Sequence, residues 1–336
     1  MNKEKDIAGM IYTLVFTILI ALLAVGGIGL MLFLPEKQLT VARTKPYSVR
    51  DEIKEGDTRF SIKLPPQVRQ KNISVSELED QPYRGFEVRI NGFLETDLLE
   101  HPLSGSLDAI EDVLYSRVGR ESIFTITTED MREISYEVND GRLDILLRTP
   151  AEIYDHIIVI DAGHGGSDTG YVSGEDKEKD ITLEIVEKLR PLFDGDEDIK
   201  VFYTRLSDED IPDTARVGFA NEMGADLFLT IHLSSTASGR TSMIGGVSAY
   251  YKTGDKDSER FAKKCLKQIL GATEALDKGL KSGDDDLLVR LSEVPAAKVE
   301  CGFITNEDEL ASLKSDEYQD AIAHALYDAI KDSLKK

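Results

Sequence analysis

Cysteine is scarce in this sequence, which has only Cys265 and Cys301 among its 336 residues. So few cysteines exclude the disulfide framework that holds many small secreted domains together. Cys265 shares a helical pattern with Phe261 and Ile269, whereas Cys301 belongs to an apolar strand. We therefore predict that both cysteines are small core residues.

Positive charge is also in short supply, with 40 Lys and Arg residues against 62 Asp and Glu residues and a formal net charge of -22. Such a chain repels phosphate backbones, and we expect no nucleic-acid partner. The acidic residues are spread along the chain and are not gathered in one tail. They predict a solvated surface and indicate no function.

Charge is missing altogether from residues 7–34, a run of 28 residues. As a helix this run would be about 42 Å long at ~1.5 Å per residue, which exceeds the roughly 30 Å hydrocarbon core of a bilayer. A signal peptide is the less favoured alternative, because its apolar region is typically about 7 to 15 residues. We predict an uncleaved transmembrane anchor over residues 1–35 and a polar tether over residues 36–50. Basic residues on both sides of the run leave its orientation open.

The rest of the chain is long enough for two globular units and contains no internal repeat. The first, residues 51–152, is predicted to be β-rich, because apolar residues alternate with polar ones in four segments. The alternating positions are Phe60, Ile62 and Leu64; Phe86, Val88 and Ile90; Ile134, Tyr136 and Val138; and Leu143, Ile145 and Leu147. The last two segments flank Asn139-Asp140-Gly141, which predicts a hairpin.

One part of this unit has helical spacing, with apolar residues at Leu107, Ile110, Val113 and Leu114. We predict a short helix there. The unit has no cluster of metal ligands or nucleophiles in its sequence. It is therefore predicted to be a spacer or a binding module.

From residue 153 to residue 336 the pattern changes to short apolar runs that alternate with amphipathic stretches. The apolar runs are 157–160, 201–203, 227–231, 247–251 and 297–303. Helical spacing joins Ile181, Ile185, Leu189 and Leu192, then Phe261, Leu266, Ile269 and Leu270, and finally Tyr318, Ile322, Leu326 and Ile330. This order predicts an α/β unit in which helices flank both faces of a mostly parallel or mixed sheet.

Ionisable side chains lie at the ends of three predicted strands. His164 lies in the glycine-rich turn after the first strand, His232 ends DLFLTIH, and Glu300 ends AAKVE. Because ligands bind outside the carboxyl ends of strands in such sheets, these side chains should converge on one edge. Two histidines and a carboxylate are a common ligand set for catalytic zinc, and a further carboxylate is needed to move protons.

The second carboxylate is expected near the start of the helical stretch EKDITLEIVEKL. Glu178 begins this stretch and is a candidate ligand, with Glu175 and Asp176 as close rivals. Each candidate also has a structural explanation. A lone histidine after a strand is more often hydrogen-bonded than metal-bound, and a salt bridge would account for Glu300.

Five segments occur in an order that is typical of one family: IVIDAGHGGSDTG, EKDITLEIVEKL, VFYTR, ARVGFANEMGADLFLTIH and VECGFITNEDEL. Through them, residues 157–336 resemble the catalytic domain of zinc-dependent N-acetylmuramoyl-L-alanine amidases of the amidase-3 type. The resemblance implies that His164, Glu178 and His232 bind Zn²⁺, and that Glu300 is the catalytic acid and base. It further implies that a zinc-activated water cleaves the amide between N-acetylmuramic acid and L-alanine of the peptidoglycan stem peptide.

One position departs from the resemblance. The family usually has Asn two residues after the second histidine, where this chain has Ser234, a change that bears on rate or substrate fit more than on metal binding. The departure keeps a second hypothesis open, a non-catalytic cell-wall-binding or scaffold protein with the same fold. A third hypothesis is a zinc peptidase that cuts within the stem peptide, because the same ligands would serve it.

The implied substrate also addresses the orientation of the anchor. Peptidoglycan lies outside the cytoplasmic membrane, so the residues after 34 should lie on the extracytoplasmic side of a single-pass protein of the cell membrane. The expected partners are then peptidoglycan and, through the N-terminal helix, the membrane. The β-rich unit would be a wall-binding or spacer module.

Overall fold

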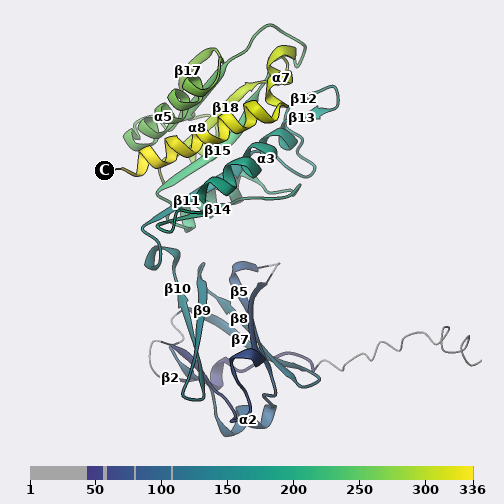
Figure 1. The fold of residues 1–336 in the computed structure, drawn as a ribbon, viewed down its shortest axis with the longest axis vertical. Coiled ribbons are helices and arrows are strands. Elements are labelled where there is room, and N and C mark those ends of the chain that lie inside the picture. The colour runs from purple at the N-terminus through teal and green to yellow at the C-terminus, as the bar shows by residue number, and fades with distance from the viewer. Residues whose placement is uncertain (1–43, 56–58, 79–80, 107–108, 336) are drawn as a thin grey trace, which may run out of the picture.

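The computed structural model describes residues 44–55, 59–78, 81–106 and 109–335, which form two units stacked along the long axis of the molecule (Figure 1). The predicted anchor and most of the predicted tether fall in residues 1–43, outside the described residues. In the part of the chain that is described, no helix is long and apolar enough to cross a membrane.

The N-terminal unit is a sandwich of two five-stranded sheets. The first sheet has the order β1 (Tyr47–Ser48), β7 (Ile110–Val118), β8 (Glu121–Thr128), β5 (Gln81–Asn91) and β4 (Ile73–Leu78). The second has the order β2 (Lys54–Glu55), β6 (Ser104–Gly105), β3 (Phe60–Lys63), β10 (Arg142–Arg148) and β9 (Glu133–Asn139), and a short helix, α2 (Glu95–Glu100), lies between β5 and β6 in the chain. The alternating residues of both sheets meet in one buried cluster, as expected for a sandwich.

The predicted hairpin is present between β9 and β10, which pair antiparallel. Its two turn residues both have positive φ, 48° at Asp140 and 74° at Gly141. Positive φ at both central residues is typical of the type I′ turn, which connects the strands of two-residue hairpins and favours Asp-Gly.

The predicted helix near residue 110 is wrong, because residues 110–118 form β7, while Leu107 lies outside the described residues. The register of β7 against β8 shifts between Ile110 and Asp112, which marks a bulge. A bulge inserts one extra residue into a strand, so Ile110 and Val113 both point into the core although they are three residues apart. Because of the bulge, two buried residues of β7 are three positions apart, which is also the spacing expected in a helix.

The C-terminal unit contains a six-stranded mixed sheet, which confirms the predicted α/β class. Its order is β14 (Ile199–Tyr203), β11 (His156–Ala162), β15 (Leu227–Ser234), β18 (Ala296–Phe303), β16 (Val247–Tyr251) and β17 (Asp277–Ser282). The first four strands are parallel, β16 runs antiparallel to β18, and β17 is parallel to β16. A small hairpin joins β12 (Val172–Ser173) to β13 (Asp176–Lys177) beside the sheet.

Helices cover both faces of this sheet. The three long helices α3 (Glu178–Leu189), α5 (Lys256–Ala272) and α8 (Asp316–Leu334) lie across one face, with α8 between the other two (Figure 1). The opposite face is covered by α4 (Asp213–Glu222) and α6 (Leu287–Arg290), and α7 (Glu307–Leu313) follows β18. Cys265 and Cys301 are buried in the core under the long helices, as predicted, and they are unpaired in the structure.

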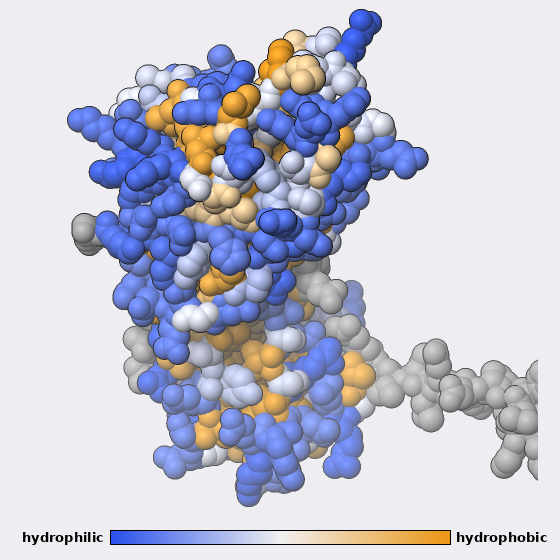
Figure 2. All heavy atoms as spheres, turned by 45° about the horizontal axis from the view of Figure 1, so that its top comes forward, coloured by the Kyte–Doolittle hydropathy of each residue, from blue (hydrophilic) through white to orange (hydrophobic). Residues whose placement is uncertain are grey.

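The surface is mainly hydrophilic over both units on the face seen in Figure 2, as the composition predicted for a solvated, acidic chain. Contacts between the units include the Lys200 ammonium of β14, which lies 2.6 Å from the Glu133 carboxylate of β9. The Tyr154 hydroxyl donates to the same carboxylate at 2.9 Å. The sandwich therefore joins the sheet at the edge formed by β14.

Candidate metal centre

The turn after β11 presents His164 at the carboxyl end of the sheet. His164 has a φ of 63°, one of two positive values found for non-glycine residues in the described chain. Gly163 precedes it, and a Cβ atom there would lie 2.4 Å from the imidazole carbon Cε1 of His232. The turn therefore needs glycine at 163 because the second imidazole lies against its backbone.

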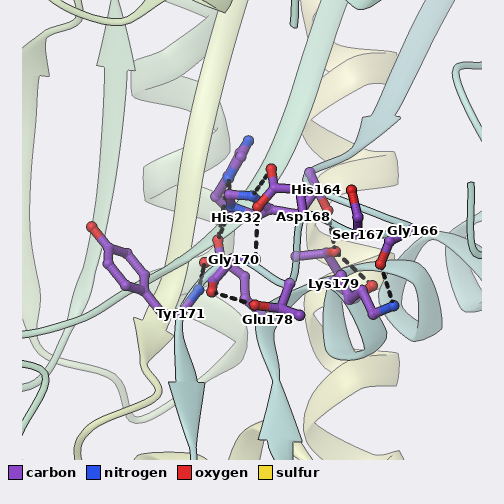
Figure 3. Close-up of polar contacts among 12 residues, drawn as sticks. His164, Gly166, Ser167, Asp168, Gly170, Tyr171, Glu178, Lys179 and His232 are labelled. Atoms are coloured by element: carbon purple, nitrogen blue, oxygen red, sulfur yellow. Dashed lines mark hydrogen bonds and ion pairs between the residues drawn. The ribbon is translucent and has the colours of Figure 1, made fainter. Parts of the chain in front are cut away.

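Three side-chain atoms meet at this edge of the sheet, one each from His164, Glu178 and His232 (Figure 3). His164 Nε2, His232 Nδ1 and Glu178 Oε1 lie 3.2 Å from one another in all three pairs. The Glu178 side chain is completely buried, and His232 is 5% exposed. The elements that supply them are the turn after β11, the first residue of α3 and the last part of β15.

Two of the three side chains, those of His164 and Glu178, are held by further contacts. His164 Nδ1 lies 2.8 Å from the Asp168 carboxylate. Glu178 Oε1 accepts a hydrogen bond from the Leu233 amide at 2.8 Å, and Glu178 Oε2 accepts one from the Tyr171 amide at 3.0 Å. Such partners fix the orientation and the tautomer of groups that bind metals.

The electrostatics favour an ionised carboxylate beside a neutral His232. Burial raises the pKa of Glu178, but hydrogen bonds from the two histidines outweigh it and hold that pKa far below its usual range. Burial and then the positive charge of Lys298 lower the pKa of His232. Burial also lowers the pKa of His164, but the nearby Glu178 and Asp168 outweigh it, so the net pKa of His164 is raised.

The three atoms fit a zinc ion in spacing and in chemistry. Tetrahedral zinc with bonds of about 2.0–2.1 Å has ligand atoms about 3.3 Å apart, close to the 3.2 Å observed for each pair. Two imidazoles and one carboxylate leave a fourth position open, as in catalytic zinc sites. The rivals do not join the group, because Asp176 pairs with Lys314 at 2.6 Å and Glu175 is exposed.

Two buried arginines fix the turn that carries His164, and neither was predicted. Arg216 of α4 donates to the Asp161 carboxylate at 2.7 Å and to the backbone oxygen of His164 at 2.6 Å. Arg205 donates to the backbone oxygens of Ala162 and Gly163 at 2.8 and 2.9 Å. Nothing local in the sequence marks these arginines as buried, because the turn that they hold lies more than 40 residues away from them.

Glu300 lies beside the three-atom group but is not part of it. It faces His232 directly in the parallel pairing of β15 with β18. Its Oε2 atom accepts hydrogen bonds from Ser248 and Tyr250 of β16, each at 3.0 Å. The structure thus places a half-buried carboxylate next to the candidate metal ligands, held from the far side by hydroxyl groups.

Ser234 is 8% exposed at the end of β15, and its backbone oxygen accepts a hydrogen bond from the Ile304 amide at 2.9 Å. The stretch from 235 to 246 that follows contains no helix. Ser234 therefore supports the edge of the site through its backbone.

The C-terminal unit is similar in sequence to known amidases. Residues 158–332 match the sequence model of a family described as N-acetylmuramoyl-L-alanine amidase. Among similar proteins, N-acetylmuramoyl-L-alanine amidase AmiC of Escherichia coli O6:H1 is 30% identical over 220 residues, which cover 52% of this chain and 52% of that protein. The germination-specific N-acetylmuramoyl-L-alanine amidase of Bacillus subtilis is 29% identical over 188 residues, covering 52% of this chain and 78% of that protein.

The C-terminal unit is also similar to solved structures of amidases. The N-acetylmuramoyl-L-alanine amidase from Clostridium difficile 630 has 30% sequence identity and a TM-score of 0.51, with 54% of this chain and 97% of that chain covered. The catalytic domain of CwlV, an amidase from Bacillus (Paenibacillus) polymyxa, has 29% identity and a TM-score of 0.50, with 53% and 98% covered. In these two structures the likeness covers about half of this chain.

Proposed function

Since this chain belongs to the N-acetylmuramoyl-L-alanine amidase family through residues 158–332, we propose that it is a zinc-dependent peptidoglycan hydrolase. It would cleave the amide that joins the lactyl group of N-acetylmuramic acid to L-alanine of the stem peptide. The observation that carries the proposal is the group of His164, Glu178 and His232 atoms, 3.2 Å apart in each pair. The proposal is supported by the hydrogen bonds to His164 and Glu178 and by the burial of Glu178 and His232, which keep these atoms at a spacing close to that of zinc ligands.

His164, His232 and Glu178 would hold the metal. When bound there, zinc supplies a Lewis acid for the substrate carbonyl and lowers the pKa of a water molecule to about 7. Asp168 keeps the metal-facing nitrogen of His164 pointed inward through its contact with Nδ1. The turn held by Arg205 and Arg216 keeps this geometry fixed while substrate binds.

Glu300 would move the proton. Its carboxylate would take a proton from the attacking water and return it to the nitrogen of the departing L-alanine, so that the amide bond breaks as a C–O bond forms. This role is supported by its place directly opposite His232 in the sheet. A carboxylate in that place can face both the water and the leaving nitrogen.

The test is to digest purified peptidoglycan with the full chain, with and without a zinc chelator, and to identify the new ends by mass spectrometry. The proposal expects intact stem peptides that begin with free L-alanine, and expects the chelator to stop their release. Shortened peptides would instead indicate a zinc peptidase. If neither wild type nor a Glu300→Gln control releases peptides, the chain is a non-catalytic wall-binding or scaffold protein.

We also propose that residues 7–34 anchor the chain in the cell membrane, with everything after residue 34 on the extracytoplasmic side. The support is the run of 28 uncharged residues together with a substrate that lies outside the membrane. The sandwich would then be the spacer or wall-binding module between the membrane and the hydrolase. Protease added to intact spheroplasts should degrade both units; protection of both would contradict this orientation.

A further inference from the structure

The candidate proton carrier Glu300 is held asymmetrically. Both of its hydrogen bonds, from Ser248 Oγ and Tyr250 Oη, go to one oxygen, Oε2, at 3.0 Å each. Among the described residues, no hydrogen bond or ion pair is made to the other oxygen, Oε1. One half of the carboxylate is therefore occupied by the protein and the other half is available to a substrate.

The two donors come from a strand that carries no candidate metal ligand. Ser248 lies directly opposite Glu300 in the antiparallel pairing of β16 with β18. Tyr250 is two residues further along β16, so it presents its side chain on the same face. His232 flanks Glu300 on the other side, from β15. Glu300 thus lies between the strand of a candidate ligand and the strand of its two hydroxyl donors.

A third residue supports the phenol. Lys281 of β17 lies opposite Tyr250 in the sheet, with its ammonium 3.3 Å from the hydroxyl and 5.1 Å from the ring centroid. Burial, together with the negative charge of Glu300, raises the pKa of Tyr250, so the phenol stays a donor at neutral pH. An ammonium that donates to a phenol oxygen polarises the O–H bond and strengthens the hydrogen bond that this O–H makes in turn.

The other charged group on this face of β18 is already paired. Lys298, two residues before Glu300, donates to the Asp286 carboxylate at 2.6 Å. Lys298 therefore contributes positive charge near the site, but the contacts that fix the Glu300 side chain come from Ser248 and Tyr250.

We propose that Ser248 and Tyr250, backed by Lys281, are positioning residues that hold Glu300 by Oε2 and leave Oε1 to exchange the proton. The inference rests on the proposed role of Glu300 as the acid and base. Without the two hydroxyl donors the carboxylate can rotate and present either oxygen in several directions. A reacting group that is misplaced by about 1 Å can cost on the order of 100-fold in rate.

The experiment uses the full chain loaded with zinc and a defined muropeptide as substrate. The variants are Tyr250→Phe, Ser248→Ala and the double variant, with Tyr251→Phe as the matched control on the opposite face of β16. Loss of one hydrogen bond to a carboxylate should lower kcat roughly 10-fold, and loss of both roughly 100-fold. KM and zinc content should stay within about twofold of wild type, because neither donor contacts the metal ligands.

A second substrate separates positioning from general damage to the fold. When the departing amine is replaced by a nitroanilide, the leaving group needs less help from an acid. The defect of Tyr250→Phe should then shrink towards wild type, which loss of folded protein would not allow. Lys281→Met, at a partly exposed position, should reproduce the effect in weaker form, about two- to threefold.

Two results would overturn the inference while leaving the proposed function standing. One is an unchanged kcat in the double variant while Glu300→Gln is inactive, which would leave the proposed function intact. The other is a defect of equal size on amide and nitroanilide. If Glu300→Gln were fully active, the role of Glu300 in the proposed function would fail, and the inference with it.

Discussion

The two units of the molecule bury different kinds of polar group. In the described part of the sandwich, the buried polar residues are Ser and Thr alone: Ser61, Ser116, Ser122 and Thr128. The sheet unit buries charged and ionisable groups as well, namely Asp161, Glu178, Lys179, Arg205, Arg216 and His232. The two cores are otherwise alike, since each is filled mainly by aliphatic and aromatic side chains.

The two kinds of buried polar group are satisfied in different ways. A buried hydroxyl is satisfied by one or two local partners, as when Ser122 bonds Tyr115 at 2.9 Å and the backbone oxygen of Phe93 at 2.8 Å. A buried charge is costly unless it is paired, so a unit that buries six charged or ionisable side chains in one region needs a network of partners. All six lie at or next to the turn of His164, which ties the cost to the candidate metal centre.

The largest expected effect is on the metal itself. Glu178→Gln removes one of three protein ligands, roughly a third of the 10–16 kcal/mol typical of protein-bound zinc, and should weaken zinc binding on the order of 1,000-fold. Competition with a chelator of known affinity measures this. Glu175→Gln, the exposed neighbour, is the matched control and should bind zinc like wild type. Equal affinities for the two variants would contradict the assignment.

The next effect is on stability. Arg216→Ala leaves Asp161 buried without its 2.7 Å partner and should cost the sheet unit about 3–5 kcal/mol of unfolding free energy. The parallel change in the sandwich, Ser122→Ala, should cost only about 1 kcal/mol. Hydrogen exchange resolved by segment reports both units in one experiment. Similar losses of unfolding free energy in the two units would contradict the proposed difference between them.

A smaller effect is expected from the partner of His164. Asp168→Asn replaces the carboxylate 2.8 Å from Nδ1 and should weaken zinc binding about 10- to 100-fold with little change in stability. Asp210→Asn, which alters a carboxylate that binds Ser167 instead, is the control. An unchanged zinc affinity in Asp168→Asn would mean that His164 needs no orienting group.

The smallest expected difference between the two units is in their stability at acid pH. The Asp161 pKa is held below its usual value, because the attraction of Arg216 and the hydrogen bonds from Thr204 and Thr230 outweigh the effect of burial. Its contribution to stability is therefore present above about pH 3.9 and is lost as the pH falls through the lowered value. The sheet unit should lose NMR amide protection in acid before the sandwich does, and Asp161→Asn should weaken this pH dependence. Simultaneous loss of amide protection in both units would contradict this prediction.

Much of the fold could be predicted because its signals are local. Five of the six strands of the mixed sheet and the three long helices follow from periodicity in short stretches of sequence. β17 was missed because its sequence, DKGLKS, is polar and lies at the sheet edge. The predicted helix near Ile110 was wrong because a bulge changes the spacing of buried residues in β7.

The site was predictable only in part, for a related reason. His164, His232 and Glu300 stand at strand ends, where the topology brings side chains together. The residues alone could not choose Glu178 over Glu175 and Asp176, because the choice depends on how α3 starts after the β12–β13 hairpin. Arg205, Arg216, Ser248 and Tyr250 act through contacts with residues more than 20 positions away, which no local pattern records.

The claim that His164, Glu178 and His232 form a zinc centre is tested most directly by anomalous diffraction at the zinc edge, on crystals of the full chain grown with zinc. The account predicts one peak about 2.0–2.2 Å from His164 Nε2, His232 Nδ1 and Glu178 Oε1. A map with no peak there, while the three side chains keep their 3.2 Å spacing, would contradict it.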